Sequence, residues 1–220
     1  MPDRKALCLV SGQLGEIGPT DRLILPGDPT VPLHATPKQY VDTSISQFPL
    51  EVGEETIPRE LLNSTSGLSS QQLRLSYFLA RKSEITTQVK MFSSTAAAAA
   101  TPTLVRMGLF TIAANGDGTL VASTVNDTTI FAATNTGYTR SWSDSYAKVA
   151  GQFYAFGLLI VSAVTMPTLA GIAILAAVAG ENALAPRSQG LITGQANLPA
   201  TFTAASVANT DRRYYGAILP

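Results

Sequence analysis

The chain has 220 residues, a net charge of zero and only 14% charged residues, although 45% of its residues are hydrophobic. An ordinary soluble domain carries roughly 25% charged residues, so the composition fits an all-β protein with small surface residues, or a chain largely covered by copies of itself. Its 15 basic residues are balanced by 15 acidic ones, which argues against nucleic acid as the main partner. A single cysteine, Cys8, excludes an intrachain disulfide and leaves a zinc site without thiolates.

Residues 1–35 predict a small β element followed by a stiff connector. An apolar strand at 6–10 precedes a Ser-Gly turn and a second short alternating segment, which is typical of a hairpin. Three prolines then follow at a spacing of three within residues 24–35, and they favour an extended, polyproline-like backbone. A hairpin this small buries too little surface to be stable alone, so we expect it to dock on a partner.

Residues 36–48 predict a short helix. Thr36 suits the N-cap, Pro37 suits the first helical position, and Pro49 ends the helix. Isolated helices shorter than about 12 residues are marginal in water, so this one must pack on something, most simply on copies of itself around an axis. We expect an interface between copies that consists of Tyr40, Val41, Ile45 and Phe48.

The rest of the chain predicts a polar linker at 49–71 and a β-domain at 72–220. Short apolar or alternating segments recur along this domain without a helical pattern between them, so we expect a jelly-roll-like β-sandwich. The candidate strands are residues 73–80, 84–92, 104–113, 118–124, 128–134, 189–194, 200–206 and 212–219. The alanine run at 96–100 is interpreted as a loop or bulge.

Residues 154–180 carry no charge and are long enough to span a bilayer. We interpret them instead as an apolar pair of buried strands, 151–163 and 169–180, joined by a short turn. Pro167 interrupts the run, its first half is β-branched and aromatic, and its flanks lack basic clusters. We therefore predict no membrane span, and cover on both faces of the strands by a second sheet or a neighbouring subunit.

The polar stretch 136–146 is the candidate recognition site. Its aromatic residues are spaced four apart and alternate with charged side chains, an arrangement that a sugar ring or a partner protein could use. The residues are Tyr138, Arg140, Trp142, Asp144 and Tyr146. The alternative is that Trp142 fills the core of the sandwich.

No catalytic residue and no cofactor are predicted. The single histidine, His34, lies in the proline-rich connector, so neither a Ser-His nor a Cys-His triad can be assembled. The adjacent carboxylates Glu54 and Glu55 are expected to be solvated. Loop oxygens near Asn115-Asp117 and Asn126-Asp127 could hold calcium, but the same residues make ordinary turns, and we predict no metal site.

Two N-terminal segments resemble bacteriophage tail fibres and related virion appendages. GDPTVPLHATPKQYVD (27–42) resembles the plHAaTKQYVD signature of these proteins, and DRKALCLVSGQLGEI (3–17) resembles their RKpLvLvnGqiqel start. Together the segments cover about a fifth of the chain. The sequence departs from the signature at Pro37, where the family usually has no proline.

The resemblance implies a non-enzymatic virion structural protein, a homotrimeric tail fibre-like appendage. Its N-terminus (1–35) would attach to other virion proteins, residues 36–48 would form the neck, and the β-sandwich would form a head that meets a host cell-surface glycan. We expect it in the virion, assembled in the host cytoplasm. A capsid decoration or head fibre protein is the alternative, and a glycan depolymerase, which predicts a β-helix, ranks last.

Overall fold

The computed structural model describes residues 53–65, 67–94, 102–163, 165–174 and 187–220, together with two strands near the N-terminus. The chain divides into two compact units, Met1–Phe48 and Pro49–Pro220. In the first unit, β1 (Leu7–Val10) pairs antiparallel with β2 (Gln13–Glu16), where the sequence predicts a hairpin. The predicted connector and the predicted neck helix, 36–48, lie outside the described residues.

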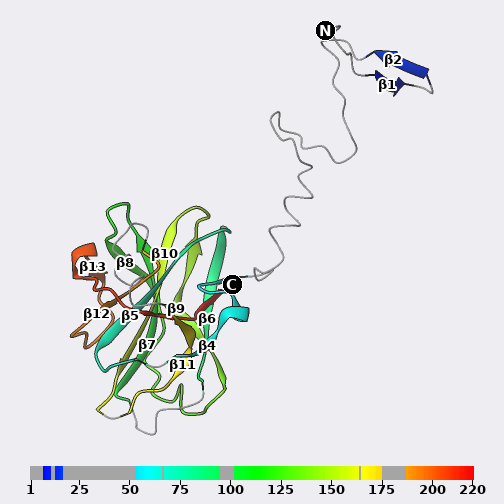
Figure 1. Cartoon of the computed structure of the whole chain (residues 1–220). Coiled ribbons are helices and arrows are strands. Elements are labelled where there is room, and N and C mark those ends of the chain that lie inside the picture. The colour runs from blue at the N-terminus through cyan, green and yellow to red at the C-terminus, as the bar shows by residue number, and fades with distance from the viewer. Residues whose placement is uncertain are drawn as a thin grey trace. The chain divides into compact units, whose positions relative to one another are not determined.

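The second unit is mainly β and consists of curled antiparallel sheets (Figure 1). A six-stranded sheet has the order β12-β5-β10-β7-β8-β13, a four-stranded sheet the order β3-β15-β6-β9, and a three-stranded sheet the order β14-β11-β4. The bounds are β3 (Glu54–Glu55), β4 (Asn63–Thr65), β5 (Gln72–Leu79), β6 (Glu84–Phe92), β7 (Leu104–Ile112), β8 (Gly118–Ser123), β9 (Gly137–Lys148), β10 (Phe153–Val161), β11 (Leu169–Ala173), β12 (Gln189–Ile192), β13 (Thr201–Phe202), β14 (Arg212–Tyr214) and β15 (Ala217–Leu219). Two short 3-10 turns, η1 (Arg59–Leu61) and η2 (Ala204–Ser206), interrupt them.

The main core lies between the six-stranded sheet and the two smaller sheets. Side chains alternate along each strand because the side-chain period of a strand is two, so β10 sends Tyr154, Phe156 and Leu158 into this core. The smaller sheets contribute residues such as Val89 and Ile218, which are fully buried, to the same core. The two layers therefore share one continuous hydrophobic core.

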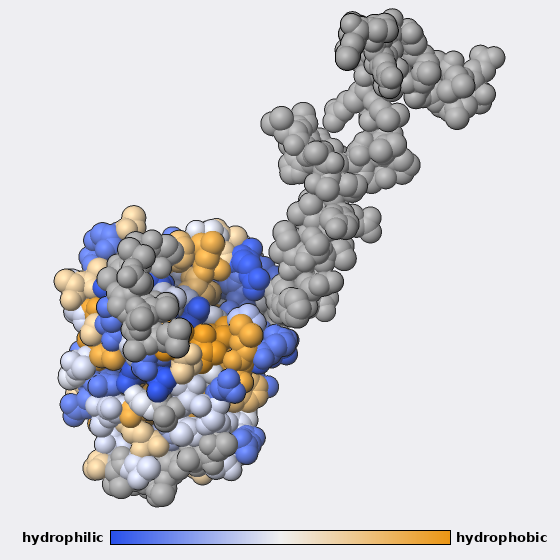
Figure 2. Space-filling view, in the orientation of Figure 1, coloured by the Kyte–Doolittle hydropathy of each residue, from blue (hydrophilic) through white to orange (hydrophobic). Residues whose placement is uncertain are grey.

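The other face of β10 is also covered. Ala155 and Leu159 pack in a second cluster with Leu198, Phe202 and other side chains of the segment that follows β12. The prediction of cover on both faces is therefore confirmed for β10, and the cover comes from a sheet on one side and a C-terminal segment on the other. On the face seen in Figure 2, apolar patches alternate with polar ones.

The strand prediction for 154–180 is confirmed for β10 and β11, but their pairing is not the predicted one. β10 pairs with β5 and β7, whereas β11 pairs with β4 and β14 in a different sheet. The segment between them therefore connects sheets rather than closing a hairpin. In the described part of the chain, no helix has the length and apolar character needed to cross a membrane.

Most candidate strands match, but residues 128–134 do not form a strand, and the predicted strand 200–206 is only the two residues of β13 followed by the turn η2. The carboxylate of Asp127 accepts hydrogen bonds from the main-chain N–H and the hydroxyl of Thr129, which closes a turn. Phe131 has a positive φ of 64°, and both Ile130 and Phe131 are buried. Ile130 and Phe131, which suggested a strand, instead pack into the core from a loop.

The β-domain begins earlier than residue 72. The predicted linker 49–71 contains β3, η1 and β4, and Ile57 is 1% exposed in a small cluster with Tyr215 and Ala217. The hydroxyl of Thr56 bonds the carbonyl of Tyr214 at 3.3 Å. Residues 53–65 are therefore part of the folded domain, in which β3 pairs with β15 and β4 pairs with β11.

Candidate functional site

The five candidate recognition residues all lie on β9, a long strand at the edge of the four-stranded sheet. They occupy even-numbered positions, so the period of two places them on one face of the strand. That face is the one turned toward the core: its side chains are mostly buried or half-buried, whereas the odd-numbered positions between them are exposed. The inward positions are therefore Tyr138, Arg140, Trp142 and Tyr146, whereas Asp144 is exposed.

Trp142 is 5% exposed and belongs to the main core. Its indole Nε1–H donates to Oγ1 of Thr86 at 3.0 Å, and that hydroxyl donates to the carbonyl of Leu219 at 2.6 Å. The chain of hydrogen bonds crosses from β9 through β6 to β15. The structure therefore places Trp142 as a core residue that links three strands, in agreement with the alternative considered for it.

Tyr138 and Arg140 hold the loop that precedes β9. The Tyr138 ring meets Phe131 edge-on with centroids 5.3 Å apart, and its hydroxyl accepts from the Ala133 N–H at 2.9 Å. Arg140 Nε lies 2.6 Å from Oδ2 of Asp127, and this contact and the Thr129 bonds lower the pKa of Asp127 despite its partial desolvation. Both side chains are thus engaged within the domain.

Tyr146 and Asp144 differ in environment. Tyr146 packs edge-on against Tyr154 with centroids 6.1 Å apart, and burial raises its pKa to about 12. Asp144 is exposed, at a point where the β6–β9 register shifts and several β9 residues oppose one β6 residue. The five residues are therefore not gathered into an open platform, and glycan recognition by this stretch stays a prediction. The neck residues Tyr40, Val41, Ile45 and Phe48 lie outside the described residues.

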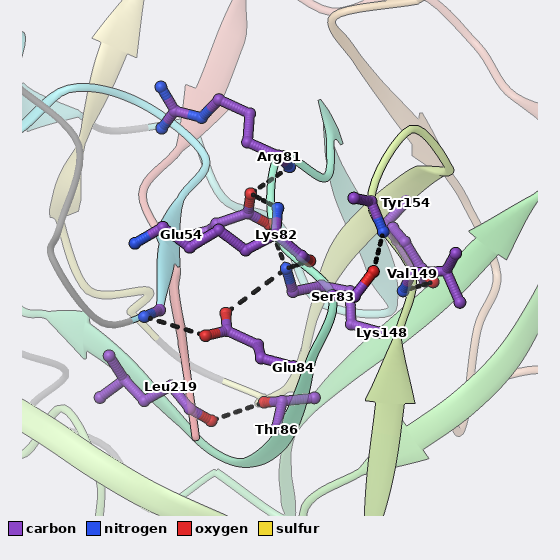
Figure 3. A network of polar contacts seen from close by, with 12 residues as sticks. Glu54, Arg81, Lys82, Ser83, Glu84, Thr86, Lys148, Val149, Tyr154 and Leu219 are labelled. Carbon is purple, nitrogen blue, oxygen red and sulfur yellow. Dashed lines mark hydrogen bonds and ion pairs between the residues drawn. The ribbon is translucent and has the colours of Figure 1, made fainter. Parts of the chain in front are cut away.

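A buried charge network lies where the folded domain begins (Figure 3). Nζ of Lys148 is 2.5 Å from Oε2 of Glu54 and 3.4 Å from Oε1 of Glu84. The side chains of Lys148 and Glu54 are 0% and 2% exposed, and that of Glu84 is 16% exposed. Unpaired charges are costly to bury, and here the Lys148 ammonium pairs with both carboxylates.

Main-chain groups complete this network. Oε1 of Glu54 accepts from the N–H groups of Arg81 and Lys82, and Lys148 Nζ also donates to the Lys82 carbonyl at 2.8 Å. The Gly53 N–H donates to Oε2 of Glu84 at 3.4 Å. The start of the domain is thereby fastened to the β5–β6 turn and to the end of β9. We refer to Glu54, Glu84 and Lys148 as the base network.

The expectation that Glu54 and Glu55 are solvated is wrong. Glu54 is buried in the base network, and the side chain of Glu55, 4% exposed, accepts from the Tyr215 hydroxyl at 2.7 Å and pairs with Arg59. Nothing in the local sequence indicates this, because Glu54 and Lys148 are 94 residues apart. The sequence does suggest that Lys148 is buried, because Lys148 lies on the same inward face of β9 as Trp142 and Tyr146.

The side chains considered for calcium form hydrogen bonds or ion pairs within the protein. Nδ2 of Asn115 donates to Oδ2 of Asp117 at 2.8 Å within the β7–β8 turn, and Asp127 is paired with Arg140. Across the residues that the structure describes, no group of three or more His, Cys, Asp or Glu side chains is placed to hold a metal ion.

The fold and these contacts define a mainly β domain of antiparallel sheets, in which the buried ion pairs of the base network hold the first described residues. No protein family matches the chain, and no sequence among curated proteins matches it.

Proposed function

We propose that this chain is a non-enzymatic structural protein of a bacteriophage virion, a homotrimeric fibre-like appendage. Its N-terminal segment attaches to other virion proteins, residues 36–48 form a three-helix neck, and the β-domain, a jelly-roll-like sandwich, is a head that meets the host surface. The observation that carries the proposal is the motif GDPTVPLHATPKQYVD at 27–42, which stands shortly before the folded β-domain.

The base network supports this arrangement physically. A head that hangs from a neck must transmit force through its first residues, and here Gly53 and Glu54 are held by the β5–β6 turn, by Glu84 and by Lys148. The low charge of the chain also suits a protein that associates with its own copies. Both features agree with an appendage, although neither is specific to one.

Two alternatives remain. A capsid decoration or head fibre protein would share the same architecture, because the attachment surface lies on the virion. A depolymerase of the kind that tail spikes carry would use a parallel β-helix, whereas the strand pairs of the β-domain are antiparallel. The tail fibre-like proposal is therefore preferred, and the capsid alternative is second.

Native mass in solution tests the proposal. We expect the mass of three chains, and we expect Ile45→Asp, on the predicted neck stripe, to yield monomers with a folded β-domain. Thr43→Asp, off the stripe, is the matched control and should remain trimeric. A wild-type chain that is a stable monomer contradicts the proposal. Antibody labelling of virions in electron micrographs separates tail from capsid attachment, and absence of label from virions contradicts both.

A further inference from the structure

A cavity of about 570 Å³ lies beside the six-stranded sheet, where β5 and β7 end and β10 begins. Its lining includes Tyr77, Ile112, Gln152, Phe153, Arg187 and Ala204, together with the turn at 113–116. Small-molecule sites in proteins commonly have volumes of roughly 300–1,000 Å³ and an apolar lining with a few placed polar groups. This cavity has that size and that mixture, and none of the contacts described above uses it.

The hydroxyl of Tyr77 is the first reason to expect a ligand here. Tyr77 is 5% exposed, and in the described structure its hydroxyl is buried without a hydrogen-bond partner. Buried polar groups nearly always have a partner, and leaving one unsatisfied costs free energy. Burial also raises the pKa of Tyr77 to about 12, so the group remains a neutral donor at physiological pH. Tyr77, a lining residue of the cavity, therefore carries a donor that no group of the described residues accepts.

Arg187 supplies the positive charge. Its Nη1 donates to the carbonyl of Val207 at 3.0 Å and to Oδ1 of Asn209 at 3.4 Å, so the guanidinium is fixed by neutral groups. No carboxylate of the described residues forms an ion pair with it. Its charge is close enough to act electrostatically on Tyr77. A positioned guanidinium and an unused phenol on one cavity are complementary to an anion.

The remaining walls limit what kind of anion fits. Ile112, Phe153 and Ala204 are apolar, and Gln152 uses its Nε2 on the carbonyls of Ile112 and Phe153 at 2.8 and 3.0 Å. The nearby carboxylate of Asp117 is occupied by Asn115 Nδ2 and by the Ala204 N–H, and it does not line the cavity. One cationic group matches a single carboxylate better than a phosphate, and the apolar walls require a body attached to it.

We propose that this cavity binds a compact organic carboxylate of about monosaccharide size, with its carboxylate on Arg187 and the Tyr77 hydroxyl and its ring against Phe153. Either an acidic sugar or a small aromatic acid has this chemistry. The inference rests on the cavity alone and does not depend on the proposed virion role.

Calorimetry with D-glucuronate and with benzoate tests the proposal on the full chain, with D-glucose as the uncharged control. We expect saturable binding of at least one acid and none of glucose. Tyr77→Phe should weaken binding at least about tenfold, the size expected for losing a hydrogen bond to a charged group, and Arg187→Gln should abolish it. The acid that binds with the lower dissociation constant shows whether the cavity prefers an acidic sugar or an aromatic acid.

The melting temperature separates a binding role from a structural one. Because the Tyr77 hydroxyl has no partner among the residues that the structure describes, Tyr77→Phe should leave the melting temperature unchanged or raise it. Tyr138→Phe is the matched control: it removes a hydroxyl that accepts from Ala133, so it should lower the melting temperature and leave ligand binding intact. The proposal is overturned if neither acid binds, if glucose binds equally well, or if Tyr77→Phe melts lower while binding is unchanged.

Discussion

Nζ of Lys148 and Oε2 of Glu54 form an ion pair at 2.5 Å, and both side chains are buried. Breaking a buried pair by removing one partner costs about 3–5 kcal/mol when the other charge is left unpaired. Glu84 remains 3.4 Å from Lys148 in a Glu54→Gln protein, so we expect a smaller loss in the free energy of unfolding, about 1–3 kcal/mol in urea titrations. Glu60→Gln, at an exposed position of η1, is the control and should change it by less than about 0.5 kcal/mol.

The triple variant Glu54→Leu/Glu84→Gln/Lys148→Met removes every charge of the base network and sharpens this test. Replacing all members of a buried ion pair or triad by neutral groups is often neutral or stabilising, so the triple variant should be at least as stable as Glu54→Gln alone. If Glu54→Gln unfolds at the wild-type urea concentration, the pair contributes nothing and its anchoring role is wrong.

Trp142 should behave as a core residue. Trp142→Ala is expected to cost about 3–5 kcal/mol through the lost packing and the cavity that remains. It also removes the donor to Thr86, which bridges β6 and β15. Ser143→Ala, on the exposed face of the same strand, should be nearly neutral. Chemical unfolding measures both, and a Trp142→Ala protein that keeps wild-type stability but loses surface binding would favour recognition instead.

Stability should fall at high pH. Burial raises the pKa of Tyr77, Tyr146 and Tyr214 to about 12, and it also raises the pKa of Tyr215. Unfolded tyrosines titrate near 10, so the folded state holds these protons longer. Their contribution is complete below about pH 10 and is lost as the pH rises through about 12. Arg213 opposes the loss, because burial lowers its pKa to about 10.

Phenolate absorbance measures this effect directly. Of the seven tyrosines, four should ionise late or only together with unfolding, which circular dichroism follows in parallel. A single ionisation step near pH 10 in a protein that keeps its β signal would contradict the prediction.

Gly53 should resist substitution more than another glycine with a similar backbone. Its φ is +85°, and a Cβ there would lie 2.5 Å from the carbonyl oxygen of Ile218. Gly194 has a φ of +73° but open space around it. Gly194→Ala should cost about 1 kcal/mol for the left-handed backbone, and Gly53→Ala about 1–3 kcal/mol more for the clash. Equal melting temperatures for the two variants would contradict this prediction, because they would show that the backbone around Gly53 can shift to accommodate a Cβ without loss of stability.

Sequence patterns predict the strands whose apolar residues alternate or run continuously. β6 is predicted at 84–92 to the residue, and β5, β7 and β8 differ by about one residue at an end. These strands are long and their buried faces are apolar, so a period of two is visible without knowledge of their partners.

Sequence patterns do not predict β9 and the short strands, and the reasons are physical. The exposed face of β9 carries small residues and its inward face mixes aromatic with charged side chains, so no apolar alternation appears. β3 and β4 are two and three residues long and polar, and they exist only through pairing with β15 and β11. The base network follows from the same long-range pairing, so it too is invisible in a local reading of the sequence.

The pairing of β3 with β15 also has a consequence for biosynthesis. Glu55 and its partner Tyr215 are 160 residues apart, so the first strand of the β-domain has no neighbour until residues 217–219 have left the ribosome. Loop closure over such a distance is slow. The edge of the β-domain that β3 forms therefore closes only after nearly the whole domain has been synthesised.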